Sequence, residues 1–495
     1  MGSLDRAPRR LPQRSERAVQ GRNPSEPSLF QMVNVEALVP PDHWLRRLDA
    51  VLDLSFVHEA VEGCYAEGRG RPGIDPELAL RMMLLGRLYD LSDRELCEEV
   101  AMHAGMRWFC RLDFHDPVPD HSTLSRLRNE RWAQSGLFER LFDEVVRQCA
   151  EAGMVSGRHL SLDGTEVAAD CSLKSLAPAT PRPAGPDPDP PPGGEGAACE
   201  PQPEGVWRGH GQRLSNETHR SRTDPDARLY RKGGGREARL SYLAHDLIDT
   251  KSRVILRRRA SRAHSGAERE VGLQMLDEVL ENGDALGLPV RPEVLTADTG
   301  YGTGAFVADV LDRGLLPHIA LQASEEREEL PTWVRRTHRL DWQRKRAEKV
   351  RLARARNRTR ALHKTRGYRV SRKLRIRSEH GFAEGKTRHG MGRARRRGLT
   401  RVDQQMLLTG VVQNLKRLAG YVHRRRRGAG AAALRASEAT SRALSAPSSP
   451  VFRRTLRHSF ILRSPARPTP SPASRRGAPS GASHRPGRAP SSTAF

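Results

Sequence analysis

Apolar residues between Phe30 and Ala152 recur every three or four positions, a spacing that places them on one face of an α-helix. One helix is expected to begin at Pro76 with Asp75 as its N-cap, because proline favours the first helical position. Another is expected to follow Ser92, since Ser92 and Glu95 have the spacing of a capping box. This part of the chain is therefore predicted to be all-helical.

A further helix is expected to begin between Asp120 and Ser122, and it carries Arg126, Arg128 and Arg131 on a polar surface. Short helices joined by tight turns, with arginines on the last, suit a DNA-binding helix-turn-helix. They suit a plain helical bundle with solvated arginines equally well. No distinct turn signature separates the two interpretations.

After Gly157 the pattern changes to short apolar runs that alternate with helical periodicity, which predicts an α/β layered domain. The expected strands are 159–163, 240–249, 253–258, 293–298 and 317–322, and the expected helices are 267–281 and 304–312. Helical periodicity returns at Glu379 and continues, with breaks, to Leu418.

Four segments do not share these patterns. Residues 1–29 are polar and lack periodicity, and a Pro/Gly-rich stretch at 178–203 predicts a surface loop or disordered insertion. A basic insertion at about 324–377 lacks an apolar stripe, which suggests an exposed helix or arm. The low-complexity residues 424–495 are expected not to fold. A helical domain at 30–152 and an α/β domain at 158–420 remain.

Positive charge is concentrated in two blocks of the 495-residue chain, whose net charge is +26. Residues 335–377 hold 19 lysines and arginines against only Asp341 and Glu348, and residues 424–495 hold 15 against Glu438 alone. Blocks of this kind match a polyanion, and nucleic acid is the commonest soluble one. A solvated linker and a disordered tail are the simpler interpretations.

Targeting signals are not evident in the sequence. No run approaches about 18 apolar residues, the Arg-rich start lacks a signal-peptide core, and the six cysteines form no CxxC pair. We therefore expect no membrane partner, reduced cysteines and a cytoplasmic protein.

Candidate chemistry lies in three carboxylates. Asp163 and Asp298 each end an expected strand, and Glu379 lies near the start of a late helix. Acids at strand ends point into the crevice where α/β sheets bind ligands. Carboxylate oxygens suit Mg²⁺, and two such ions about 3.5–4 Å apart can serve one phosphodiester displacement.

Each acid also has a simpler interpretation. Asp163 with Gly164 could form a hairpin turn, Asp298 could cap the turn that follows it, and Glu379 could pair with Arg375 one turn earlier. Spacing alone does not decide between metal binding and these structural roles.

Several sequence blocks, in order, resemble the DDE transposases of bacterial insertion sequences, in the branch with a helical amino-terminal domain. The resemblance runs from about Phe30 to Leu418. Each block is weak alone, but the ordered set is specific. The blocks are residues 119–124, 163–165, 219–227, 297–301, 317–320 and 379–386, continuing to Asn414 and Leu415.

The resemblance implies a ribonuclease-H-like catalytic domain of mixed sheet and flanking helices, preceded by an all-α, DNA-binding domain. It implies that Asp163, Asp298 and Glu379 form a metal-binding triad for two Mg²⁺ ions, with Mn²⁺ as a substitute. The implied function is DNA transposition, by cleavage and strand transfer at the ends of a mobile element. The implied partners are terminal inverted repeats, target DNA and further copies of the chain on paired ends, and the implied location is the nucleoid.

Residues around the glutamate extend the resemblance. In this family an arginine often lies four positions before the glutamate and a lysine seven after, which Arg375 and Lys386 match, and the lysine is thought to contact DNA. A tyrosine usually lies three positions before that arginine, but Arg372 stands there. Glu384 lies on a different helix face and is a second candidate for the acid.

Further DNA contacts are expected from the basic block and from the helical domain. The candidates are Arg344, Lys345 and Arg346 for phosphates and Arg126 and Arg128 for bases. The segment after Arg424 matches nothing in the family. Two alternatives to a transposase are a ribonuclease-H-like nuclease without strand transfer, and an inactivated or recruited DNA-binding protein.

Overall fold

The computed structural model describes residues 34–65, 73–179, 214–231, 237–323, 326–330 and 340–445, with side chains as far as residue 428. The expectations for residues 1–29, most of 178–203 and the tail after residue 445 lie outside these ranges. Among the described residues, no helix has the length and apolar character needed to cross a membrane.

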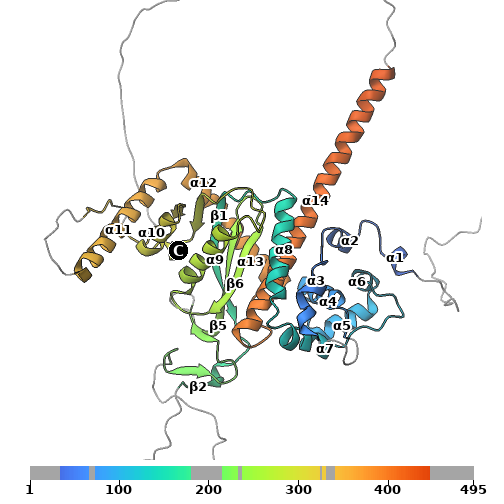
Figure 1. The fold of residues 1–495 in the computed structure, drawn as a ribbon, viewed down its shortest axis with the longest axis horizontal. Coiled ribbons are helices and arrows are strands. Elements are labelled where there is room, and N and C mark those ends of the chain that lie inside the picture. Colours follow the sequence, from blue (N-terminus) through green and yellow to red (C-terminus); the bar gives the residue numbers. More distant parts are fainter. Residues whose placement is uncertain are drawn as a thin grey trace, which may run out of the picture. The chain divides into compact units, whose positions relative to one another are not determined.

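The first part of the chain is helical, as the periodicity predicts (Figure 1). Asp75 caps the N-terminus of α4 by accepting a hydrogen bond from the Glu77 amide, and Ser92 and Glu95 form a complete capping box on α5. The expected helix near Asp120 is α7, which a short π-helix at 127–131 extends. The helices are α1 (Val35–Leu38), α2 (Trp44–Asp49), α3 (Val57–Val61), α4 (Pro76–Leu88), α5 (Asp93–Met102), α6 (Ala104–Phe109), α7 (His121–Arg126) and α8 (Leu137–Glu151).

A six-stranded mixed sheet follows. Its central strand β1 pairs antiparallel with β5 and parallel with β7, and the order across the sheet is β6-β5-β1-β7-β8, with β4 also on β5. This is the ribonuclease-H-like arrangement that the family resemblance implies. The strands are β1 (His159–Ala168), β4 (Arg228–Tyr230), β5 (Arg239–Asp249), β6 (Ile255–Arg262), β7 (Val294–Ala297) and β8 (Leu316–Ile319), and β2 (Leu176–Pro178) pairs with β3 (His219–Ser221) apart from them.

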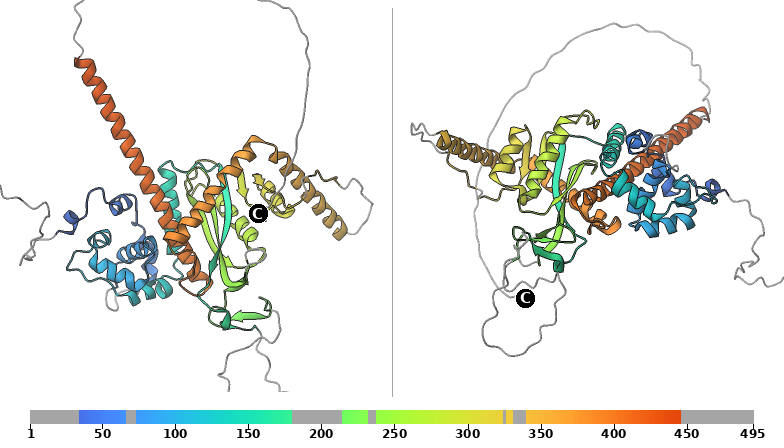
Figure 2. Two further views of the ribbon diagram at one scale, coloured as in Figure 1. Left: turned by 180° about the vertical axis from the view of Figure 1, so that it is seen from behind. Right: turned by 60° about the horizontal axis from the view of Figure 1, so that its bottom comes forward.

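Helices cover both faces of the sheet (Figures 1 and 2). On one face, α9 (Ala267–Glu281) packs so closely that a Cβ at Gly272 would lie 2.4 Å from Leu162 Cδ2, so a larger residue there would force the Leu162 side chain to shift. On the other face lie α13 (Ile376–Arg388) and the first part of α14 (Leu399–Ser445). Ser378 of α13 contacts Ser161 of β1, with 2.8 Å between the two hydroxyl oxygens.

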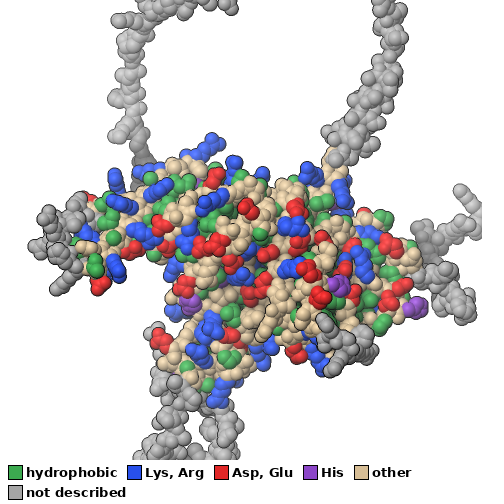
Figure 3. Space-filling view, in the orientation of Figure 1, with side chains coloured by type: hydrophobic (Ala, Val, Ile, Leu, Met, Phe, Trp, Pro, Cys, Tyr) green, Lys and Arg blue, Asp and Glu red, His purple; other side chains and the backbone are tan. Residues whose placement is uncertain are grey.

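The basic insertion forms two helices, α11 (Leu340–His363) and α12 (Arg366–Leu374). The second half of α11 is not a free arm, because Ala355 packs with side chains of α10 (Gly304–Asp312) and Arg351 pairs with Asp309 and Asp312. The first half of α11 is mostly exposed, and Arg344, Lys345 and Lys349 lie on its exposed surface. Lys and Arg side chains gather along the edge that α11 and α12 form (Figure 3).

Helix α14 continues past Arg424 to Ser445, so the boundary expected at residue 424 falls inside a helix. Residues 429–445 are rich in alanine, the residue with the highest helix propensity, and contain no proline. A helix that is already packed against the sheet supplies the nucleus, so each added residue needs only favourable propagation.

Candidate active site

Two of the three predicted acids occupy adjacent positions in the sheet. Strands β1 and β7 pair in parallel register as far as Ser161 and Thr296, and Asp163 and Asp298 each follow this pair by two residues. Both carboxylates lie close enough to the Tyr301 hydroxyl to act on it by charge. Strand β7 ends at Ala297 whereas β1 continues, which opens the edge of the sheet next to both carboxylates. Asp163 is only 9% exposed, and its Oδ1 accepts a hydrogen bond of 2.9 Å from the Gly164 amide.

Two buried polar atoms near these aspartates lack a hydrogen-bond partner in the part of the chain that the structure describes. Asp298 Oδ1 and the Tyr301 hydroxyl are buried and have no hydrogen-bond partner among the described atoms. Burial, together with the negative charges of Glu268, Asp163 and Asp298, raises the pKa of Tyr301 well above its usual value. A buried carboxylate oxygen without a donor is costly, so this site suits a bound cation.

Glu268 is an acid that the sequence did not point to. A Cβ at Gly164 would lie 3.0 Å from Glu268 Oε1, so this carboxylate of α9 lies against the backbone next to Asp163. Acidic residues are common in the first turn of helices because they offset the helix dipole. Nothing in the local sequence distinguishes Glu268 from such a residue.

Glu379 lies in the first turn of α13, one residue after the Ser378 that contacts β1. Its side chain is 52% exposed and forms an ion pair of 3.2 Å with Arg375, as the simpler interpretation of the sequence expects. Among the described residues, no three His, Cys, Asp or Glu side chains are grouped closely enough to hold a metal ion. The structure thus places Asp163 and Asp298 on neighbouring segments of the sheet, near Tyr301, and places Glu379 on the helix that contacts β1.

Hydrogen bonds fix the approach to α13. The Ser371 hydroxyl of α12 lies 2.6 Å from His159 Nε2 of β1 and 2.6 Å from His318 Nδ1 of β8. Burial lowers the pKa of both histidines, that of His318 to about 4, so both are neutral near pH 7. Arg377 also donates to the Thr250 carbonyl oxygen at 2.6 Å, which holds the start of α13 against the sheet.

Glu384, the second candidate for the acid, has a structural role. It forms ion pairs with Lys416 and Arg417 of α14 and lies near His389. Burial alone would raise its pKa, but hydrogen bonds from His389 and Lys416 outweigh burial and hold the pKa far below its usual range. These cations already satisfy its charge.

The candidate phosphate contacts differ in exposure. Lys386 is exposed, and seven residues of helix place it two turns from Glu379 on the same face of α13. Arg344 and Lys345 are exposed on the first half of α11, whereas Arg346 is half-buried and lies over the Trp342 ring at 5.4 Å.

The two candidate base contacts, Arg126 and Arg128, differ in exposure. Arg126 is exposed, but Arg128 is 4% exposed and bonds to Asp93 of α5. The expectation that Arg128 faces DNA therefore does not fit its position, because its guanidinium joins α5 to the segment after α7. The sequence hides this role, since Asp93 lies 35 residues earlier.

A ribonuclease-H-like sheet with one aspartate inside its central strand and another directly after the neighbouring parallel strand defines a class of enzymes that process nucleic acids. Two family models identify the particular family: a transposase DDE domain matches residues 206–415, and a transposase domain (DUF772) matches residues 33–130. The chain belongs to the DDE-type transposases of insertion sequences, enzymes that cleave DNA and transfer its strands with the help of divalent metal ions.

The DDE match includes Asp298 and Glu379 but begins after Asp163, so the case for Asp163 rests on its register with Asp298. Among solved structures, the chain is similar to the crystal structure of a pre-cleavage Mos1 transpososome. That similarity has 10% identity and a TM-score of 0.16, and it covers 64% of this chain and 80% of the other.

Proposed function

We propose that Asp163, Asp298 and Glu379 hold two Mg²⁺ ions, with Mn²⁺ as a substitute, for cleavage and strand transfer at the ends of an insertion sequence. The buried Asp298 Oδ1 that lacks a donor, next to Asp163 in strand register, carries this proposal. When bound, the ions supply an activated attacking oxygen and stabilise the leaving oxygen.

Glu379 completes the set from α13. Its side chain is half-exposed and its only described ion pair is with Arg375, so turning toward the aspartates costs little packing. Arg375 then becomes available to a DNA phosphate, and Lys386 lies on the same helix face two turns further. One helix thus presents both an acid for metal and cations for the strand being cut.

The proposed DNA partners are the terminal inverted repeats and the target duplex. Arg344, Lys345 and Arg346 of α11 contact phosphates, while Arg126 of α7 is exposed where it can contact bases. Copies of the chain assemble on paired ends in the nucleoid.

Replacing Asp298 with Asn tests the assignment. An amide is neutral and a poorer Mg²⁺ ligand, so strand cleavage of a duplex bearing an element end should fall by at least a hundredfold, with DNA binding retained. Asp284→Asn, which changes an exposed acid away from the site, is the matched control and should cleave like the parent. A fully active Asp298→Asn protein would contradict the proposal.

The products of the same reaction separate the alternatives. Joined target and donor strands identify a transposase, whereas cut ends that are never joined identify a ribonuclease-H-like nuclease. Binding without cleavage by the parent protein in Mg²⁺ identifies a recruited or inactivated DNA-binding protein.

A further inference from the structure

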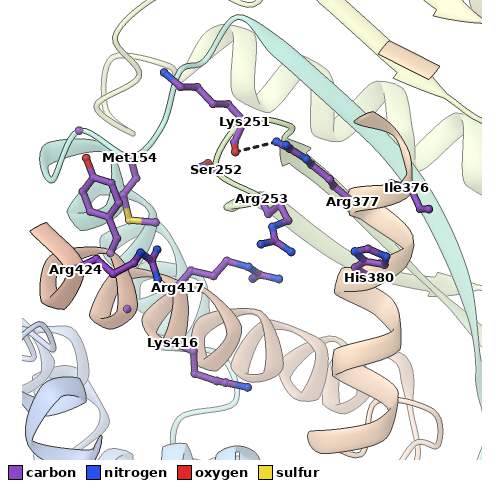
Figure 4. A pocket seen from close by; sticks show the side chains of 13 residues that line it. Met154, Lys251, Ser252, Arg253, Ile376, Arg377, His380, Lys416, Arg417 and Arg424 are labelled. Atoms are coloured by element: carbon purple, nitrogen blue, oxygen red, sulfur yellow. Dashed lines mark hydrogen bonds between the residues drawn. The ribbon is translucent and has the colours of Figure 1, made fainter. Parts of the chain in front are cut away.

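A second site of positive charge lies on another side of α13 from Glu379. A cavity of about 660 Å³ opens between the β5–β6 turn, the start of α13 and the middle of α14 (Figure 4). We call it the basic pocket; its cations are Lys251, Arg253, Arg377, Lys416, Arg417 and Arg424. No aspartate or glutamate is among the residues that line it.

The carboxylates close to the basic pocket are engaged elsewhere. Asp249 accepts hydrogen bonds from Ser156, Ser252 and the Gly157 amide, which fix the β5–β6 turn. Asp246 forms a buried bidentate pair with Arg258. Glu384 pairs with two of the pocket's own cations, Lys416 and Arg417, and lies near His389.

Four cations therefore lack a carboxylate partner within the described part of the chain: Lys251, Arg253, Arg377 and Arg424. Arg377 donates to the carbonyl oxygens of Thr250 and Lys251, which orient its guanidinium but do not neutralise it. Like charges gathered at a half-buried site repel each other, and an anion between them removes that cost.

Arg253 occupies a backbone conformation that does not favour it. Its φ is +64°, in the left-handed region, and its amide closes the turn on the Asp249 carbonyl oxygen at 2.8 Å. Glycine is the favoured residue in this conformation. An arginine held there points its guanidinium into the basic pocket, toward Arg417 (Figure 4). Backbone strain that positions a side chain in this way is typical of a functional site.

We propose that the basic pocket binds a phosphodiester group of the DNA duplex, at a site separate from the three acids. This rests on the proposed function for the presence of DNA. Lys251, Arg253 and Arg424 are exposed at the rim and Arg377 and Arg417 lie deeper, so a backbone phosphate can enter while the duplex stays outside. DNA bound here also contacts Arg377, which lies two residues from Glu379 on α13, so the DNA contacts the helix that carries the acid.

Chemical protection of Lys251 in the unmodified protein tests the site directly. Acetylation by an N-hydroxysuccinimide ester is quantified by mass spectrometry, with exposed Lys174 as the internal control. A saturating duplex of an element end should slow acetylation of Lys251 at least fivefold and leave Lys174 unchanged. Inorganic pyrophosphate at the same phosphate concentration should protect Lys251 less than the duplex does, because it lacks the other phosphate contacts that hold the duplex on the protein.

Variants supply the second readout. Lys251→Ala with Arg253→Gly should lower the slope of log affinity against log salt by up to about two units, since each lost phosphate contact removes about 0.9 unit. The melting temperature should stay the same or rise, because glycine suits φ +64°. The control pair Lys174→Ala with Arg291→Ala removes the same charges from exposed positions outside the pocket and should leave the slope unchanged.

If Lys251 stays fully reactive while the duplex is bound, the proposal that the basic pocket binds DNA is wrong, whereas the proposed transposase function is unaffected. Pyrophosphate protection of Lys251 without protection by the duplex would assign the pocket to a small anion instead. A protein that binds no DNA at all would refute both the pocket and the proposed function.

Discussion

Neighbouring arginines in this chain can have different roles, one exposed to solvent and one buried in an ion pair, and their sequence context does not show which is which. Arg126 and Arg128 lie two residues apart, yet one is exposed and the other is buried against Asp93. The difference arises because the helix after α7 turns Arg128 inward, toward a carboxylate that comes from α5. A basic residue is therefore a DNA contact only where tertiary structure leaves it unpaired.

Alanine at Arg128 should lower the stability of the fold, whereas alanine at Arg126 should weaken DNA binding. Arg128→Ala leaves Asp93 partly buried with Arg396, at 3.3 Å, as its remaining ion pair among the described residues, so the free energy of unfolding should fall by about 3 kcal/mol. Arg126→Ala should change stability by less than about 0.5 kcal/mol and weaken binding to element ends. Urea unfolding and fluorescence anisotropy measure the two effects. A stable Arg128→Ala protein with impaired DNA binding would restore Arg128 as a DNA contact.

At the scale of elements, α11 is divided between packing and exposed charge. Its second half is tied to α10 and to Glu328 through Arg351, Arg356 and Arg360, whereas residues 340–349 are mostly exposed. A helix whose second half is packed and whose first half is exposed can place cations along a DNA duplex while the packed half stays fixed to the domain. The composition of the block predicted the charge but not the packing, because alanines and arginine stems supply the buried face.

The exposed half of α11 should account for part of the salt dependence of DNA binding. Changing Arg344, Lys345 and Arg346 together to Ala should lower the slope of log affinity against log salt by up to about three units. Preference for element ends over scrambled duplexes should be unchanged, because phosphate contacts carry no sequence information. The measurement is a salt titration on both duplexes. An unchanged slope would make this half of α11 a solvated arm.

At the scale of the whole molecule, local sequence patterns predicted where most helices and strands lie. They did not predict features that depend on contacts between residues far apart in the chain. The caps at Asp75 and Ser92 and the bounds of α9 and α10 follow from nearby residues. The expected first strand stopped at Asp163, but β1 continues to Ala168 because residues 164–168 pair with β5, which lies far along the chain.

The candidate site shows the same division. Asp163 and Asp298 could be proposed from expected strand ends, and the structure places both near the Tyr301 hydroxyl, after the last pair of β1 with β7. The closeness of Glu268 to Gly164, and the pairing of Glu384 with α14, depend on helix packing that no local pattern encodes. The order of motifs, rather than any single spacing, was what pointed to the family.

Whether Glu379 joins the two aspartates around metal is the central claim, and Mn²⁺ binding to the protein on an element-end duplex tests it most directly. Mn²⁺ is titrated and followed by electron paramagnetic resonance for the parent, for Glu379→Gln and for the control Glu281→Gln, an exposed acid at the end of α9. We predict that Glu379→Gln weakens Mn²⁺ binding at least tenfold and that Glu281→Gln matches the parent. Equal Mn²⁺ affinity in the parent and in Glu379→Gln would contradict the account.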